Sequence, residues 1–177
     1  TTLFDYILTE RINLMRTKGV TLQVADLSDR YQVAKLFSEE YDVVYLLAAV
    51  AHASRSNTAP FQAIQNGLVP FSNFLAEAIN APKTRLVYMS SSTVYGNFKK
   101  EVVDETDECK PFGMYALLKY QAEQLLIESS LHSDINFSVA RPSALYGERC
   151  ISRRVSQIFL ENAISGVPLV FRGDKNE

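Results

Sequence analysis

The sequence predicts an α/β fold built on a doubly wound parallel sheet. Short runs rich in β-branched and aromatic residues alternate along the chain with longer segments whose apolar residues recur at helical spacing. The runs are mostly apolar, which is typical of parallel strands covered by helices on both faces. With 177 residues the chain has room for a single domain, which we expect to span residues 1–177.

The first predicted elements are a helix from Phe4 to Lys18 and a strand at Val20–Ala25. A second helix follows from Ser28 to about Glu40, because apolar residues recur there at helical spacing. Ser28 or Asp29 can cap the beginning of that helix with a side-chain oxygen.

A second strand is predicted at Asp42–Ala48, followed by a long helix from Pro60 to Asn80. That helix ends before Pro82, because proline cannot continue a helix. The remaining elements are, in order, a strand at Arg85–Ser90, a helix at Met114–Leu131 and strands at Asn136–Arg141 and Pro168–Phe171.

The composition indicates a folded globular protein and excludes several classes of partner. Hydrophobic residues make up 47% of the chain, which is too apolar for disorder, and the formal net charge is −2. No long basic run is present, so we expect no nucleic-acid partner. No apolar run approaches the roughly 20 residues that span a bilayer, so we expect no membrane partner either.

Cysteine and acidic residues give no sign of a metal site. Cys109 and Cys150 lie far apart, without a metal-binding spacing, and predict reduced thiols in a cytoplasmic setting. The acidic stretch from Asp104 to Glu108 lies next to Pro111 and is interpreted as a solvated loop.

Ligands of an open parallel sheet bind beyond the carboxyl ends of its strands, so the residues that follow each run are the informative ones. Asp26 follows the first run and can accept a hydrogen bond from an adenosine, although capping of the next helix explains it equally well. Ala48 and Ala49 allow close approach of a ligand or of a packed helix. The hydroxyl cluster Ser90–Gly96 suits a reacting oxygen, or satisfies a turn.

Tyr115 and Lys119 lie one turn apart on one face of the predicted helix. An isolated tyrosine, with a pKa of about 10, is a poor base at neutral pH, and a neighbouring cation can lower that value. The same spacing occurs in two other pairs, Tyr31 with Lys35 and Tyr95 with Lys99. Only Tyr115 opens a long amphipathic helix after a serine-bearing strand end.

In this order the residues resemble the extended short-chain dehydrogenase/reductase family of NAD-dependent nucleotide-sugar epimerases and dehydratases. The resemblance runs over nearly the whole chain. It is carried by Asp26-Leu27, by Leu47-Ala48-Ala49, by Ser90–Gly96 with its Val-Tyr-Gly ending, by Tyr115 with Lys119 as Tyr-x-x-x-Lys, and by Arg141-Pro142-Ser143-Ala144-Leu145-Tyr146-Gly147. It implies a Rossmann-like fold.

The resemblance also implies roles for individual residues. Ser91, Tyr115 and Lys119 would be catalytic. The residues that would contact NAD are Asp26, Leu27, Leu47, Ala48, Ala49, Asn66, Ser90, Tyr115, Lys119, Pro142 and Ser143, although the spacing of Asn66 to Asn73 is one residue off the family pattern. The residues that would contact a nucleotide-sugar substrate are Ser91, Ser92, Thr93, Arg149 and Arg154; surface arginines at the start of a helix would explain the last two equally well.

In the implied mechanism Tyr115, as phenolate, removes a proton from a sugar hydroxyl while hydride leaves the same carbon for NAD. Ser91 hydrogen-bonds the oxygen, and Lys119 lowers the pKa of the tyrosine and holds the nicotinamide ribose. Dehydratases of the family usually have an acidic residue where this chain has Ser92 or Thr93. The sequence therefore favours an epimerase, with a 4,6-dehydratase or a reductase as the alternative.

The seven glycines of the chain do not form the glycine-rich loop that holds the dinucleotide pyrophosphate in the family. We therefore expect an internal fragment that is incomplete at both ends, with the substrate-binding region beginning at about residues 147–177. The helices Phe61–Ile79 and Met114–Leu131 resemble a pair through which family members dimerise, and they predict a homodimer. A non-catalytic dinucleotide sensor or scaffold is the competing function, and a Tyr115 side chain far from Ser91 would favour it.

Overall fold

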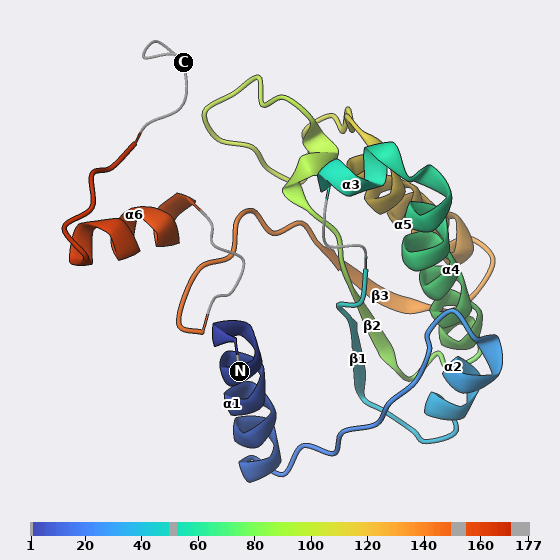
Figure 1. Cartoon of the computed structure of the whole chain (residues 1–177). Helices are drawn as coiled ribbons and strands as arrows, with labels where there is room; N and C mark the ends of the chain where they lie inside the picture. The colour runs from blue at the N-terminus through green and yellow to red at the C-terminus, as the bar shows by residue number, and fades with distance from the viewer. Residues whose placement is uncertain (1, 50–52, 150–154, 171–177) are drawn as a thin grey trace. The chain divides into compact units, whose positions relative to one another are not determined.

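The computed structural model describes residues 2–49, 53–149 and 155–170 (Figure 1). Contacts between residues divide the chain into two units. The larger is Val24–Ser143, and the smaller combines Thr1–Gln23 with Ala144–Glu177.

The larger unit contains a parallel sheet in the order β1 (Val43–Leu46), β2 (Arg85–Met89) and β3 (Asn136–Ala140). Leu46 of β1 pairs with Tyr88 of β2, and Met89 of β2 pairs with Ala140 of β3. The strands therefore end together at one edge of the sheet. The structure confirms the predicted α/β class and three of the predicted strands.

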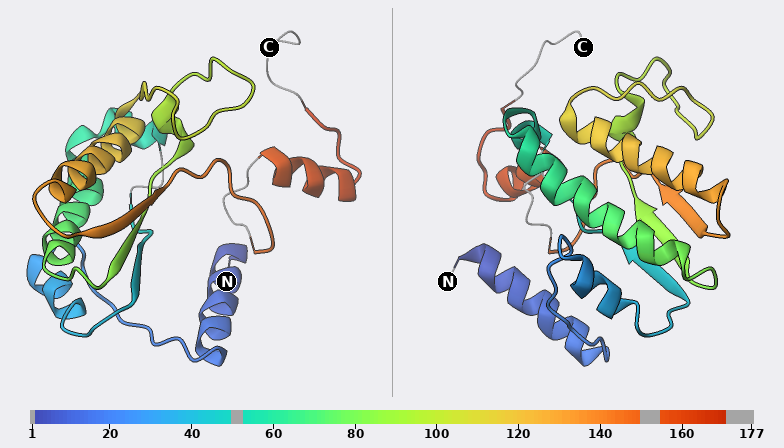
Figure 2. Two further views of the ribbon diagram at one scale, coloured as in Figure 1. Left: turned by 180° about the vertical axis from the view of Figure 1, so that it is seen from behind. Right: turned by 90° about the vertical axis from the view of Figure 1, so that its right-hand side faces the viewer.

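Three helices of this unit cover one face of the sheet: α2 (Arg30–Leu36), α4 (Pro60–Ile79) and α5 (Met114–Ser130). In the right-hand view of Figure 2, α4 and α5 run side by side across the sheet. The core between these layers consists of Val33, Leu46, Phe71, Phe74, Leu75, Ala78, Leu86, Tyr88, Ala122, Leu126 and Ile135. On the opposite face of the sheet, Val43 and Tyr45 of β1 are exposed.

α2 is shorter than the predicted helix from Ser28 to about Glu40, and Asp29 rather than Ser28 is its N-cap. Asp29 accepts hydrogen bonds from the backbone N–H groups of Tyr31 and Gln32, at 2.9 and 3.4 Å. The helix stops at Leu36, because Phe37 adopts a turn conformation and packs edge-on against Phe74. Two short elements escaped the sequence analysis, α3 (Ala53–Thr58) and the 3-10 helix η1 (Ser92–Tyr95).

The predicted strand at Val20–Ala25 is wrong, since this segment has no strand structure. Val20, Leu22 and Val24 are exposed, and Val24 begins the larger unit. Among the described residues the sheet contains only β1, β2 and β3, so this segment has no ladder hydrogen bonds of the kind that a strand requires. Residues 168–170 of the predicted strand Pro168–Phe171 have no strand structure either, and Phe171 lies outside the described residues.

The smaller unit contains α1 (Leu3–Thr17) and α6 (Val155–Ile164). Thr2 and Asp5 form a reciprocal capping box at the beginning of α1, where each side chain accepts a hydrogen bond from the other residue's backbone. The predicted helix Phe4–Lys18 is thus confirmed within one residue at each end. No helix in the described part of the chain is long and apolar enough to cross a membrane.

Candidate active site

Three predicted site segments lie at the carboxyl edge of the sheet: 47–49 after β1, 90–95 after β2 and 141–143 after β3. The β2 and β3 segments remain joined past the strands, because Ser90 N–H donates to Ala140 O at 2.8 Å and Ser92 N–H donates to Pro142 O at 3.0 Å. The parallel register therefore brings together residues that lie far apart in the sequence.

A small pocket lies between this edge and α5. Its lining residues are Ala49, Ser56, Gly67, Tyr88, Tyr115, Leu118 and Lys119. Tyr115 is half-buried and Lys119 is 6% exposed. The predicted phenol and ammonium thus share one pocket, together with Ala49, while Leu47 is 64% exposed and does not line it.

Lys119 is a buried cation with two contacts. Its Nζ donates a hydrogen bond to Met89 O at 2.6 Å and lies 5.0 Å from the centroid of the Tyr88 ring. Burial lowers the pKa of Lys119 to about 8, because the charged form loses solvation. A pKa of about 8 leaves the ammonium as the favoured form at pH 7.

The beginning of α5 is fixed by a residue that the sequence analysis missed. Gly113, the N-cap, has no side chain, and Asn57 of α3 instead accepts a hydrogen bond from Met114 N–H through Oδ1, at 2.8 Å. Tyr115 follows directly. The sequence offers no signal for this contact, because Asn57 lies far from Met114 along the chain.

Ser91 is 9% exposed and caps η1. Its Oγ accepts two hydrogen bonds from Thr93, one from the backbone N–H at 3.2 Å and one from the side-chain hydroxyl at 3.0 Å. A serine hydroxyl has two acceptor sites and one proton to donate. Thr93 therefore leaves the Ser91 proton to be donated, and no hydrogen bond from Ser91 Oγ to Tyr115 is present among the described residues.

Gly96 ends η1 with a φ of 69° and a ψ of −132°. A Cβ at this position would lie 2.1 Å from Lys110 O. We expect Gly96→Ala to lower the free energy of unfolding by about 2–4 kcal/mol, from strain and overlap together. Urea unfolding monitored by circular dichroism measures the change. Gly19→Ala is the control, since Gly19 also has a positive φ but no atom near the added Cβ; an equal loss in both variants would contradict the overlap.

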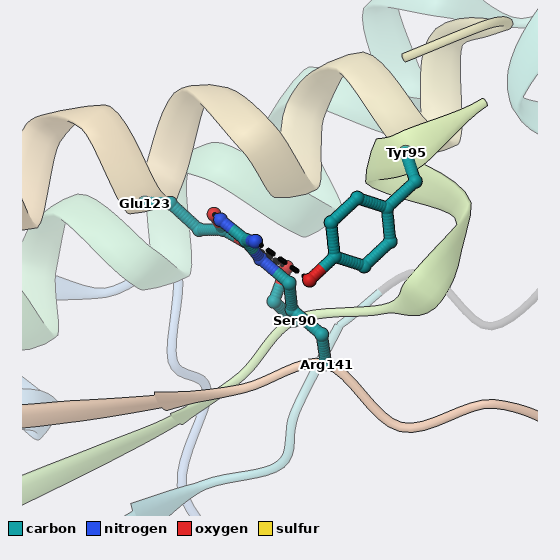
Figure 3. A network of polar contacts seen from close by, with 4 residues as sticks. All are labelled: Ser90, Tyr95, Glu123 and Arg141. Carbon is teal, nitrogen blue, oxygen red and sulfur yellow. Dashed lines mark hydrogen bonds and ion pairs between the residues drawn. The ribbon is translucent and has the colours of Figure 1, made fainter. Parts of the chain in front are cut away.

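Ser90 and Arg141 meet at a buried carboxylate, Glu123 of α5, which is 1% exposed (Figure 3). Ser90 Oγ donates to Glu123 Oε1, and the Arg141 guanidinium forms a salt bridge to Glu123 with a shortest distance of 2.6 Å. Arg141 also donates to Tyr95 Oη at 2.9 Å. The hydroxyl proton of Ser90, which was predicted to contact a cofactor, is thus engaged in a hydrogen bond to Glu123. Sequence reasoning missed Glu123, although it stands one helical turn beyond Lys119.

The predicted adenosine-contacting segment forms a tight turn. The Asp26 carboxylate accepts hydrogen bonds from the backbone N–H and hydroxyl of Ser28, at 2.9 and 2.7 Å, which hold the pKa of Asp26 below its ordinary value. Asn73 Nδ2 donates to Leu27 O at 2.9 Å and to Ser28 O at 3.0 Å, which joins this turn to α4. Asn66 is exposed on α4 and does not line the pocket of Tyr115 and Lys119.

Pro142 and Ser143 line a larger, open pocket on the η1 side of β3, together with Ser92, Tyr95 and Arg141. Arg149 belongs to the smaller unit, where its guanidinium lies 3.2 Å from Glu148 and 3.8 Å from Glu10. Its cation therefore already faces two carboxylates. Arg154 and Cys150 lie outside the described residues.

The two competing Tyr/Lys pairs have other environments. Tyr31 is 89% exposed and Lys35 is exposed. The Tyr95 hydroxyl accepts from Arg141, and Lys99 faces Glu108 at 3.9 Å. Asp104, Glu105 and Glu108 of the acidic stretch are exposed, and the stretch forms ion pairs, Lys100 with Asp107 and Lys110 with Glu108, which agrees with the predicted solvated loop.

The match to known proteins covers almost the whole chain. A family model described as "NAD dependent epimerase/dehydratase family" matches residues 6–177. The chain belongs to this family. A UDP-glucose 4-epimerase from Caenorhabditis elegans is 30% identical over 125 residues, which are 67% of this chain and 35% of the relative. A dTDP-glucose 4,6-dehydratase from Streptomyces antibioticus is 24% identical over 162 residues, which are 92% of this chain and 48% of the relative.

A structure of UDP-glucuronic acid 4-epimerase from Bacillus cereus, in complex with NAD and a UDP-sugar, superposes with a TM-score of 0.81. The two sequences are 23% identical, and the match covers 94% of this chain and 52% of that protein. This likeness confirms the Rossmann-like fold of the NAD dependent epimerase/dehydratase family. The chain spans less than half the length of the curated relatives that it matches.

Proposed function

We propose that this chain forms part of an NAD-dependent nucleotide-sugar epimerase. The observation that carries the proposal is the pocket that Tyr115 shares with the buried Lys119 at the carboxyl edge of the sheet. Family membership and the relatives named as 4-epimerases support C4 of the sugar as the reacting carbon.

Each residue has a defined task in the proposed reaction. Tyr115 accepts the proton of the sugar hydroxyl when the alcohol is oxidised to a ketone and returns it when the ketone is reduced on its other face. Ser91 donates to the sugar oxygen the proton that Thr93 leaves available. Lys119, held by Met89 O, supplies positive charge beside the phenol.

In this proposal the pocket receives the nicotinamide ribose of NAD. Ala49 has a small side chain and Gly67 has none, which permits close approach of a flat ring. Lys119 can donate hydrogen bonds to ribose hydroxyls. When bound, NAD supplies the hydride acceptor for the oxidation and the donor for the reduction. Both Ser92 and Thr93 lack a carboxyl group, so no side chain in these two positions provides the second proton transfer of a dehydratase.

A homodimer is part of the proposal. Apolar side chains remain exposed on the two long helices, Phe61 and Ile64 on α4 and Leu117 and Leu125 on α5. Their burial in a second copy would remove this apolar surface from water.

Epimerisation of a defined substrate tests the proposal. The full-length protein that contains this chain is incubated with NAD and, separately, with UDP-glucose, UDP-arabinose, UDP-glucuronate, UDP-N-acetylglucosamine or dTDP-glucose, and the products are assigned by NMR. We expect one UDP-sugar to approach an equilibrium of two epimers without net formation of NADH. A product lighter by one water would identify a dehydratase, and net NADH formation would identify a dehydrogenase; either result alone would overturn the epimerase.

A further inference from the structure

We propose that Glu123 and Arg141 form a clamp that positions Ser91 against the helix carrying Tyr115 and Lys119. The inference rests on the proposed function, because it assigns Ser91 a part in the reaction. It adds two positioning residues that do not themselves touch the substrate.

One side of the clamp holds the residue before Ser91. Ser90 is 3% exposed, its hydroxyl donates to Glu123 Oε1, and its N–H donates to Ala140 O at 2.8 Å. Both the side chain and the backbone of Ser90 are thus fixed. Because consecutive Cα atoms lie about 3.8 Å apart, a fixed Ser90 confines the backbone of Ser91.

The other side of the clamp holds the end of η1. Arg141 Nη1 donates to Tyr95 Oη at 2.9 Å, and its guanidinium carbon lies 4.9 Å from the centroid of the Tyr95 ring. The remaining donors of Arg141 face Glu123: Nε lies 3.1 and 3.2 Å from the two carboxylate oxygens, and Nη2 lies 2.6 Å from Oε2. Figure 3 shows Arg141 between Glu123 and Tyr95. The hydroxyl segment from Ser91 to Val94 is therefore bounded by two clamped residues.

The clamp is built on the catalytic helix. Tyr115, Lys119 and Glu123 follow one another at i+4 spacing on α5, which places them along one side of the helix. While Glu123 is hydrogen-bonded to Ser90, a shift of α5 relative to β2 moves Tyr115 and Ser91 together. Without that hydrogen bond, Tyr115 would move and Ser91 would stay behind. This linkage distinguishes Glu123 from an ordinary core residue.

Stability alone does not explain an ion pair at this depth. Glu123 loses nearly all its solvation, and a buried ion pair is often no more stable than apolar residues of similar volume. The pair does supply direction, because a guanidinium binds a carboxylate in one planar arrangement. A geometric role accounts for the cost of burying the Glu123 carboxylate beside the partly exposed Arg141.

The first test replaces Glu123 by glutamine, which keeps the size and removes the charge. With NAD and the UDP-sugar that the wild-type protein epimerises, we expect Glu123→Gln to lower kcat by about 10–100-fold while KM stays within about threefold, since misplacement of a catalytic group by about 1 Å has an effect of this order. A crystal structure of the variant should show Ser91 Oγ displaced from its wild-type position relative to Tyr115 Oη. An unchanged kcat, or an unmoved Ser91, would overturn the clamp.

Leu126→Ala is the matched control for lost stability, because Leu126 is 0% exposed on the same helix and belongs to the core. At a temperature where circular dichroism shows both variants folded, Leu126→Ala should keep the wild-type kcat. An equal loss of kcat in Glu123→Gln and Leu126→Ala would show that Glu123 acts only through stability, which would overturn the clamp. The double variant Glu123→Met with Arg141→Met avoids an unpaired buried charge; it should fold stably and still lose turnover, and normal turnover there would overturn the clamp.

A double-mutant cycle with Ser91→Ala separates this inference from the proposed function. If Glu123 acts through Ser91, adding Glu123→Gln to Ser91→Ala should lower kcat by less than about twofold more. An additional loss as large as that of Glu123→Gln alone would overturn the clamp and leave the function standing. Full turnover by Ser91→Ala alone would instead refute the role of Ser91 in the proposed function.

Discussion

Phenylalanine in place of Tyr115 is expected to lower kcat by about 10²–10⁴-fold, the usual contribution of a positioned general base. The variant lacks only the hydroxyl, so the ring still fills its half-buried site and the fold should persist. NAD binding should stay within about threefold of wild type, because the proposed ribose contact comes from Lys119. Turnover of the UDP-sugar that the wild-type protein epimerises measures the first effect, and titration calorimetry with NAD measures the second.

Tyr31→Phe is the matched control for this experiment. Tyr31 has the same spacing to a lysine as Tyr115 but is 89% exposed on α2, so its hydroxyl should contribute nothing to turnover. Near-normal turnover by Tyr115→Phe would remove Tyr115 from the reaction. Equal losses in the two variants would point to a cause other than proton transfer.

The second large effect is expected from Lys119→Met, which should lower kcat by about 10²-fold or more because the cation beside the phenol is lost. Stability should behave differently. The substitution removes a buried charge together with one hydrogen bond to Met89 O, so we expect the free energy of unfolding at pH 7 to be equal to or above that of wild type. Lys35→Met, at an exposed lysine with the same spacing to a tyrosine, is the control.

The pH dependence of stability provides an independent check on Lys119. Its pKa falls from 10.5 to about 8 on folding, so between these values the unfolded chain binds more protons than the folded one. The destabilisation by Lys119 is therefore fully present below about pH 8 and is relieved as the pH rises. Urea unfolding at pH 7, 8 and 9 should show wild type gaining stability relative to Lys119→Met. If the free energy of unfolding of wild type instead fell relative to Lys119→Met as the pH rises, burial would not destabilise the Lys119 ammonium.

The sequence located most of the site because the strand ends of a parallel sheet converge. Three apolar runs of the sequence predicted β1, β2 and β3. The residues that follow these strands, among them Ala49, Ser91 and Pro142, lie at one edge of the sheet. The i+4 spacing predicted that Tyr115 and Lys119 share a side of α5, and they line one pocket. Local pattern sufficed here, because it depends only on helical and strand geometry.

Local pattern failed where a partner decides the structure. The run Val20–Ala25 is as β-branched as a strand but forms no ladder, because strand structure needs a neighbouring backbone. In the same way Asn57 caps α5 and Asn73 holds the turn at Leu27, both across long stretches of sequence. No window of residues reveals such contacts.

By itself, the sequence determined the α/β class, the long helices and the residues with the chemistry of a dehydrogenase-like site, because helical periodicity and apolar runs are properties of adjacent residues. Only the tertiary structure decided how that chemistry is held. It buries Lys119 beside Tyr88, which lowers the pKa of Lys119 to about 8. It also brings Ser90 and Arg141 into contact with the Glu123 carboxylate. Burial and hydrogen bonding join residues from different elements, and the solvation that these groups lose is set by the packed core.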